Sequence, residues 1–307
     1  MTPPLIFDRS LLRARRRRGL RLGAETFLLD RVAEDFADRL GAVVRRFDLA
    51  VDLGTPTAAV RTALLRNGAI GTIIALDPMI DAAQHLSGDH AAAAASRVVA
   101  DEEALPFADN TLDLVVSGLS LQAVNDLPGV LVQIRRALKP DGLFLAALLG
   151  GDTLAELRQS FAMAESELDG GVSPRVAPFP DLRDMGALLQ RAGFALPVTD
   201  VDRIRVRYAT PLALLHDLRR MGAANPLVER RRVPLRRATL MRAIEVYAAR
   251  FADSDGKVRA SFDIIWLSGW SPHESQQQPL RPGSAKTRLA DALGTTEISA
   301  GEKPQQS

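Results

Sequence analysis

Five short apolar runs, interleaved with helical stretches, constrain the fold of this chain more than any other feature. The runs are FDLAVDLG (47–54), TIIALD (72–77), RVVAD (97–101), LDLVVSGLSL (112–121) and LFLAALLGG (143–151). They show no alternation of apolar and polar residues, which is typical of strands that are buried on both faces. Helical periodicity at 57–67, 79–94 and 127–138 separates several of them, and KPDG at 139–142 is expected to be the turn before the fifth strand. This alternation predicts an α/β fold with a parallel sheet and right-handed crossovers.

The second half of the chain has a looser pattern. Helices are expected at 154–168, 181–192, 211–221 and 236–251, and strands at 197–208 and 260–270. The last strand would close the sheet in the antiparallel direction. The chain then divides into an N-terminal helical extension (1–46), an α/β domain (47–275) with a helical insertion (209–259) between its last two strands, and a polar, partly disordered tail (276–307).

Composition excludes several classes of site. The chain has no cysteine, which excludes disulfides, zinc–thiolate sites and thiol nucleophiles. Its four histidines lack the spacing of a metal site, so no metal is expected. Arginines cluster at 13–18 and 219–237 without interleaved aromatic residues, so we expect solvated helix faces and no nucleic-acid partner. No apolar run reaches the roughly 20 residues of a membrane span, which leaves at most a peripheral membrane contact.

The turn after the first strand, VDLGTPTAA, is similar to a nucleotide-binding loop. Asp52 and Gly54 hold the first positions of a D-x-G-x-G-x-G pattern, in which glycine lets the backbone approach a ligand. The two later glycine positions hold Pro56, which has no amide hydrogen, and Ala58, which adds a methyl group. The loop is therefore a degenerate form of the pattern, and we expect these two residues to weaken cofactor binding.

Acidic residues also follow the second and third strands. Asp77 could accept hydrogen bonds from both ribose hydroxyls of a nucleoside, and Asp101 with Glu102 could accept from an adenine amino group. Each acid could instead cap a short turn or helix. Because the carboxyl ends of parallel strands meet at one edge of a sheet, we favour a single pocket. Ser117, near the end of the fourth strand, completes the predicted cofactor-binding set.

A polar loop follows the last strand, with the sequence SGWSPHESQQQPLRPGSA. A loop with so many hydrogen-bonding groups is costly to order without a function. His273 and Gln276 are therefore candidate catalytic residues, together with Asp152 after the fifth strand. An irregular polar tail docked on the sheet is an equally simple interpretation.

Longer motifs make the sequence resemble one family. They are IFDR, VDLG, ADEEALPFADNTLDLVVSGLSL, VNDLP, LKPDG, GGDTLAELR, GGVSPRVAPF, LLQRAGF, HESQ and RPGSA, between about residues 5 and 286. This combination resembles the family of respiratory complex I assembly factor 5, described as arginine hydroxylases built on a methyltransferase fold. A more distant similarity is to the malonyl-carrier-protein O-methyltransferases of biotin synthesis.

The resemblance implies a Rossmann-like class I methyltransferase fold. Its sheet would have seven mostly parallel strands, helices on both faces and an antiparallel last strand. The cofactor would be S-adenosyl-L-methionine, held by Asp52, Gly54, Asp77 and Asp101. The partner would be a protein substrate, an iron–sulfur subunit of complex I, modified on an arginine by hydroxylation or methylation.

An arginine substrate would require carboxylates that bind its guanidinium group. Asp152, Glu156 and Glu165 follow the fifth strand and are candidates, although Glu165 is expected to be a charge on a helix surface. Where mitochondrial members of the family carry His-Trp after the fourth strand, this chain has Gln122 and Ala123, which removes an aromatic wall from the expected pocket.

Two other functions fit the same residues. One is a non-catalytic assembly chaperone with a degenerate cofactor site, favoured by Pro56 and Ala58. The other is an O-methyltransferase that acts on a small molecule or a carrier protein.

The chain begins almost where mature members of the family begin. A bacterial protein of this kind would act in the cytoplasm, at the inner face of the membrane, and a eukaryotic one in the mitochondrial matrix.

Overall fold

The fold is described from a computed structural model. It describes residues 5–66, 68–79, 96–277 and 289–296, so the helix expected at 79–94 lies almost wholly outside the described residues. The chain forms two compact units, Met1–Pro272 and His273–Ser307. Residues 1–46 therefore belong to the same unit as the predicted α/β domain.

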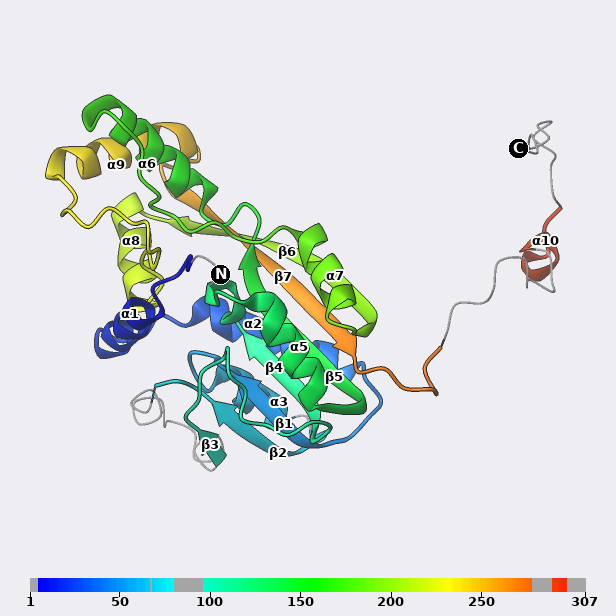
Figure 1. The fold of residues 1–307 in the computed structure, drawn as a ribbon. Coiled ribbons are helices and arrows are strands. Elements are labelled where there is room, and N and C mark those ends of the chain that lie inside the picture. Colours follow the sequence, from blue (N-terminus) through cyan, green and yellow to red (C-terminus); the bar gives the residue numbers. More distant parts are fainter. Residues whose placement is uncertain (1–4, 67, 80–95, 278–288, 297–307) are drawn as a thin grey trace, which may run out of the picture. The chain divides into compact units, whose positions relative to one another are not determined.

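A seven-stranded sheet forms the centre of the first unit (Figure 1). Its strands are β1 (Phe47–Leu53), β2 (Ile70–Leu76), β3 (Ser96–Val98), β4 (Leu112–Gly118), β5 (Leu138–Gly150), β6 (Ala195–Tyr208) and β7 (Val258–Trp270). Their order across the sheet is β3-β2-β1-β4-β5-β7-β6. The first five strands pair in parallel, and β7 runs antiparallel between β5 and β6. The predicted fold class, with its antiparallel last strand, is confirmed.

The KPDG turn predicted before the fifth strand is wrong in detail. The chain already pairs with β4 at Leu138, and the register shifts before Leu143 pairs with Leu114. Asp141 lies in this irregular part with φ +63° and forms an ion pair with Arg45. The turn residues are therefore a bulge within β5, because a strand that is hydrogen-bonded on both sides of a short insertion keeps its pairing.

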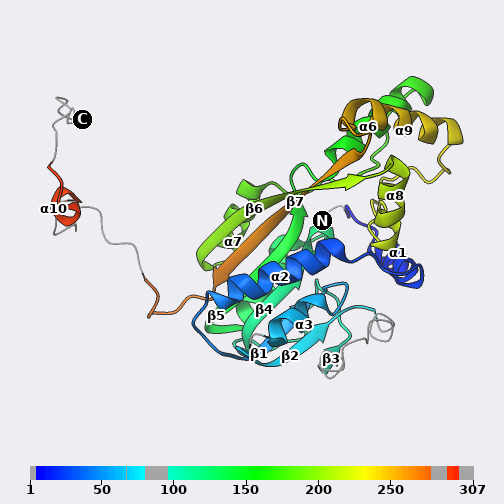
Figure 2. The same ribbon diagram turned by 180° about the vertical axis from the view of Figure 1, so that it is seen from behind.

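Helices cover both faces of the sheet, as Figures 1 and 2 show from opposite sides. On one face lie α2 (Phe27–Gly41) and α3 (Ala59–Arg66), and on the other lie α5 (Leu127–Ala137) and α7 (Leu182–Arg191). Each pair buries its apolar side chains against the sheet and forms a separate core. Two buried faces explain why the central strands are apolar without alternation.

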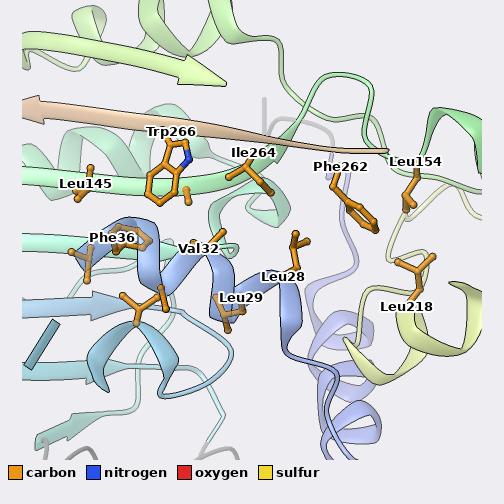
Figure 3. Close-up of a cluster of buried hydrophobic side chains, with 14 of the residues drawn as sticks. Leu28, Leu29, Val32, Phe36, Leu145, Leu154, Leu218, Phe262, Ile264 and Trp266 are labelled. Carbon is orange, nitrogen blue, oxygen red and sulfur yellow. The ribbon is translucent and has the colours of Figure 1, made fainter. Parts of the chain in front are cut away.

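The larger core lies between α2 and the strands β5 and β7 (Figure 3). Leu28, Leu29, Val32 and Phe36 follow one another at helical spacing and are all buried. The ring of Phe36 meets Trp266 of β7 edge to face, with the ring centroids 4.9 Å apart, and both residues are at most 2% exposed. Such a pair contributes about 1 kcal/mol beyond its buried area. This contact fixes α2 across the strands.

The other helices described in the first unit lie beyond one end of the sheet (Figure 1). They are α1 (Arg9–Arg21), α6 (Ala155–Leu168), α8 (Pro211–Arg220) and α9 (Arg237–Phe251). A short 3-10 helix, η2 (Leu121–Ala123), follows β4. Close approach of α1 to the end of α8 requires Gly19, since a Cβ there would lie 2.5 Å from the carbonyl oxygen of Arg220. The helices predicted within 209–259 are thus present as α8 and α9.

The second unit contains α10 (Leu289–Leu293) in its described part. No helix within the described ranges of either unit is long and apolar enough to cross a membrane.

Candidate functional site

The turn after β1 brings the backbone close to two polar side chains. Gly54 has φ +68°, and a Cβ on it would lie 2.5 Å from Oγ of Ser120 and 2.8 Å from Oε1 of Glu102. Both neighbours are side-chain atoms that would have to move, and the positive φ also disfavours any residue with a Cβ, so glycine suits this position in conformation and in space. The predicted approach of this loop to a ligand site has its structural basis in Gly54.

Asp52 is held by two partners within the protein. It is completely buried, and Oδ2 accepts a hydrogen bond from Nη1 of Arg61 at 2.6 Å, while Oδ1 accepts from the hydroxyl of Thr55. The carboxylate therefore ties the loop to α3. Ser117 is also fully buried, and its hydroxyl donates to the carbonyl oxygen of Leu53 at 2.8 Å. Asp52 and Ser117, both in the predicted cofactor set, therefore hold the loop in place through contacts within the protein.

Asp77 lies at the end of β2 and remains partly exposed. Its Oδ1 accepts a hydrogen bond from the backbone N–H of Met79 at 2.6 Å, which is the capping role weighed from the sequence. Burial raises the pKa of Asp77 to about 6, although the Met79 N–H and the guanidinium of Arg16 lower it. Burial destabilises the ionised form of such a carboxylate, and hydrogen bonds from hydroxyl groups of a ligand would stabilise it.

Asp101 and Glu102 follow β3 and are held by α1. Arg9 forms ion pairs with both carboxylates, and Nη2 of Arg13 lies 2.5 Å from Oδ2 of Asp101. Burial opposes ionisation of Asp101, but the backbone N–H of Glu103 and the guanidinium of Arg9 outweigh it and lower the pKa. The solvated helix face predicted for the arginines at 13–18 is therefore wrong for Arg13, while Arg17 and Arg18 are exposed as predicted.

Arg16 is the most buried of the α1 arginines, with 9% of its surface exposed. Its Nη1 lies 3.8 Å from Oε1 of Glu102, a longer separation than a hydrogen bond. Burial lowers the pKa of Arg16 below its ordinary value, and the carboxylates of Glu102 and Asp77 partly offset this. The guanidinium thus faces the acids at the sheet edge without a close hydrogen-bonded partner among the described residues.

Two adjoining cavities open beside these groups. The first cavity has a volume of about 120 Å³ and is lined by Arg16, Pro56, Thr57 and Met79 among others. The second cavity has a volume of about 260 Å³ and lies among apolar residues of α6, α8 and β7, including Phe262. They share Leu12, Leu28, Gln122, Ala123, Leu149, Met221 and Ala223 as common walls. A smaller cavity with Arg16 and Gln122 in its mostly apolar wall therefore meets a larger apolar cavity between α1 and the ends of β4 and β5.

The carboxylates predicted to bind a guanidinium group lie elsewhere. The side chain of Asp152 is 74% exposed, and Glu156 is buried with Oε1 accepting from the Ser261 hydroxyl at 2.6 Å. Glu165 is completely buried and pairs with Arg175 at 2.5 Å, so the predicted surface position of Glu165 is wrong. None of the three acids belongs to the described lining of either cavity.

A different carboxylate, that of Glu25, lines the first cavity. It precedes α2, and among the described lining residues it is the one carboxylate in either cavity. Its Oε2 pairs with Nη1 of Arg220 at 2.8 Å. The sequence offered no signal for Glu25, since it belongs to neither a motif nor a strand end.

His273 and Gln276 belong to the second unit. There Nδ1 of His273 lies 2.6 Å from the hydroxyl oxygen of Ser275, and Oε1 of Gln276 accepts from the His273 backbone N–H at 3.2 Å. Of the three predicted catalytic residues, Asp152 therefore belongs to the first unit, and His273 and Gln276 belong to the second. Within the described ranges, no group of three or more histidine or acidic side chains could hold a metal ion.

Comparisons with known proteins agree with the fold. Residues 51–146 match the methyltransferase domain family. The chain is 42% identical to the human arginine hydroxylase NDUFAF5, over 93% of this chain and 83% of that protein, and 38% identical to the zebrafish protein, over 93% and 89%. A malonyl-[acyl-carrier protein] O-methyltransferase of Xylella fastidiosa is 35% identical over 76% of this chain and 77% of its own length.

Among solved structures, a protein from Bacillus halodurans described as a methyltransferase superposes with a TM-score of 0.54. The alignment covers 77% of this chain and 97% of that structure at 14% identity. At this level of identity the likeness shows the fold alone.

Proposed function

The chain belongs to the family of the arginine hydroxylase NDUFAF5, within the class I S-adenosylmethionine-dependent methyltransferase superfamily, and we propose that it binds S-adenosylmethionine and modifies an arginine of a protein. One observation carries this proposal. Gly54, Asp77 and Glu102 lie at three different strand ends: Gly54 lies against Glu102, and the charges of Glu102 and of Arg16, which lines the first cavity, both act on Asp77. Such a convergence at the carboxyl ends of parallel strands is where nucleotide-type ligands bind in α/β folds.

The residues at this edge fit the polar parts of S-adenosylmethionine. Asp77 would accept from the ribose hydroxyls, and Asp101 with Glu102 would accept from the adenine amino group. The methionine part carries a carboxylate, and Arg16, buried and without a close hydrogen-bonded partner among the described residues, would pair with it. Pro56 lines the cavity without an amide hydrogen, so this residue would contribute shape there and no backbone hydrogen bond.

The protein's own part in the reaction is to position groups and exclude water. When bound, S-adenosylmethionine supplies a positively charged sulfonium and an electrophilic methyl group. Because Arg9 and Arg13 tie α1 to the acids after β3, this helix would cover the cofactor and orient it through Arg16. The apolar walls around the second cavity would keep the acceptor side of the site dry.

Hydroxylation of an arginine is the proposed reaction, by family membership. It inserts one oxygen atom into a C–H bond; with dioxygen as oxidant, two electrons and two protons from an external donor convert the second oxygen atom to water. Methylation is the second form of the proposal: an N–CH₃ bond forms, the S–CH₃ bond breaks and a proton leaves the nitrogen. The proposed protein substrate is an iron–sulfur subunit of complex I, in the cytoplasm of a bacterium or the matrix of a mitochondrion.

Gene deletion followed by mass spectrometry of the complex I subunits tests this proposal. We expect one arginine to lose a mass increment of one oxygen atom, or of one methylene group for methylation. Wild-type DNA should restore the mark, while a gene that encodes Asp77→Ala should not. If the mass of every arginine-containing peptide of the subunits stays the same after deletion, the proposed enzymatic function is contradicted.

A non-catalytic chaperone is the second candidate function. It is favoured by one observation: in the free protein, the carboxylates of Asp101 and Glu102 are already neutralised by Arg9. In the same complementation experiment, Asp77→Ala would then restore complex I assembly although no arginine is marked. Growth of a biotin auxotroph on expression of this chain would instead indicate the malonyl-carrier-protein O-methyltransferase activity.

A further inference from the structure

We propose that Glu25 and Gln122 bind the guanidinium group of the substrate arginine, an inference that rests on the proposed function. Both side chains line the first cavity, and Gln122 also lines the second. They are a carboxylate and an amide oxygen, which are the acceptors that a guanidinium group prefers.

Glu25 already binds a guanidinium group in the free protein. Its Oε2 accepts from Nη1 of Arg220 at 2.8 Å, and Nε of Arg220 donates to the carbonyl oxygen of Gly23 at 2.7 Å. The side chains of Arg220 and Glu25 are 28% and 23% exposed, and both line the first cavity. A substrate arginine that enters this cavity would therefore compete with Arg220 for the same carboxylate.

The amide group of Gln122 makes a hydrogen bond through its nitrogen, while its oxygen has no donor among the described residues. Its Nε2 donates to the carbonyl oxygen of Leu119 at 2.8 Å, which fixes the orientation of the amide group. Its Oε1 is buried and has no hydrogen-bond partner among the described residues. A buried acceptor in this state destabilises a protein unless a ligand completes it.

Leu119 adds a second unfavourable feature at the same place. It has φ +50°, a left-handed conformation that a leucine rarely adopts. Strained backbone of this kind persists mainly where function needs the resulting geometry. The strained residue holds Gln122 through its carbonyl group, so strain and the unpaired acceptor meet at the wall of both cavities.

The walls suit the rest of an arginine side chain. Leu12, Leu28 and Leu149 line both cavities and would contact its methylene groups. Long basic side chains bind in this way, with the stem on apolar surface and the charged head among polar groups. The peptide that carries the arginine would then enter from the larger, apolar second cavity.

Calorimetric titration of the full chain with two small ligands tests the site. The ligands are N-acetyl-arginine amide and its citrulline analogue, which has nearly the same shape without the charge. Each is titrated with and without saturating S-adenosylhomocysteine. We expect the arginine ligand to bind at least about tenfold more tightly, because a charge-assisted hydrogen bond is lost with citrulline. Equal affinities, or no binding of the arginine ligand in either state, overturn the proposal.

Variants at three positions locate the contacts. Glu25→Gln and Gln122→Met should each weaken arginine binding about tenfold, and Arg220→Met should strengthen it because the competitor is removed. Glu245→Gln is the matched control, since Glu245 pairs with Arg242 at 3.2 Å on an exposed helix. Unchanged arginine affinity in Glu25→Gln, or weaker binding in both Arg220→Met and the milder Arg220→Gln, contradicts the inference.

The two proposals can fail separately. Affinity for S-adenosylhomocysteine should stay the same in Glu25→Gln and Gln122→Met, because neither residue is assigned to the cofactor. A protein that binds S-adenosylhomocysteine but no arginine ligand disproves the guanidinium site and leaves the cofactor site standing. A protein that binds neither disproves both.

Discussion

Glu102 and Gly54 lie in direct contact across the edge of the sheet, although they belong to different strand–helix units. A Cβ on Gly54 would be 2.8 Å from both Cγ and Oε1 of Glu102. The carboxylate of Glu102, which would accept from the adenine group, therefore packs directly against the first loop. Any side chain at position 54 must displace it.

Gly54→Ala is predicted to lose both stability and cofactor binding. The left-handed backbone, with φ +68°, costs an alanine about 1–2 kcal/mol, and displacement of Glu102 adds to this. We expect S-adenosylmethionine to bind at least tenfold more weakly, measured by calorimetry. Gly170→Ala is the control, since Gly170 has φ +69° and open space around its Cα. Equal losses of stability in the two variants would show that Glu102 is not in the way.

Asp77→Asn is predicted to stabilise the free protein at neutral pH. The pKa of Asp77 is raised from 3.8 to about 6, so the ionised carboxylate destabilises the folded state above pH 6, and this penalty vanishes below the unfolded pKa. We expect a gain of about 3 kcal/mol in the free energy of unfolding at pH 7.5, since one pKa unit corresponds to about 1.4 kcal/mol and the pKa differs by about two units. The gain should shrink as the pH falls from 6 to 4.

Urea unfolding at several pH values checks this prediction, with Asp109→Asn as an exposed control. Asp109 lies on the surface beside Arg136, and its replacement should change stability little at any pH. A gain in Asp77→Asn that does not depend on pH would show that burial of the charge is not its cause.

The ion pair between Asp52 and Arg61 is predicted to be needed as a pair. Nη1 of Arg61 lies 2.6 Å from Oδ2 of Asp52, and Asp52 is completely buried. Asp52→Ala leaves a buried charge without a partner and should cost about 3–5 kcal/mol. The double variant Asp52→Leu with Arg61→Met should recover most of that loss, as thermal unfolding can measure. A double variant as unstable as Asp52→Ala would contradict a purely structural role for the pair.

S-adenosylmethionine is predicted to slow hydrogen exchange in α1. Arg16 on this helix would pair with the cofactor carboxylate, while Arg9 and Arg13 hold the helix to the acids after β3. Binding should therefore raise the free energy of opening for residues 9–21. Mass-spectrometric exchange with and without cofactor checks this, and Arg16→Met should abolish the protection. Faster exchange with the cofactor would mean that α1 must leave for the ligand to bind.

The strands and the glycine of the first loop could be predicted from the sequence because they depend on local patterns. Strands buried on both faces need continuous apolar runs, and a tight turn that approaches other residues needs Gly54. The N-terminal arginines show the limit of such patterns. Residues 9, 13 and 16 share one helix face, but Arg9 meets Glu102 across 93 positions of the chain, and no local pattern specifies such a contact.

The orientation of residues at strand ends was also beyond local patterns. Successive side chains along a strand point to opposite faces, so Asp52 and Asp77 could each have faced the ligand edge or the interior. The structure turns Asp52 toward Arg61 and leaves Asp77 partly exposed. Glu165 fails for a similar reason, because its burial depends on Arg175, which lies outside its helix.

Calorimetric titration of the purified chain with S-adenosylmethionine, in wild-type and Asp77→Ala forms, tests most directly whether the sheet edge is a cofactor site. One site per chain is expected in the wild type, with binding at least tenfold weaker in Asp77→Ala and unchanged in Asp109→Ala. Absence of binding to the folded wild-type protein at millimolar ligand, or equal binding by the wild type and Asp77→Ala, would contradict the account.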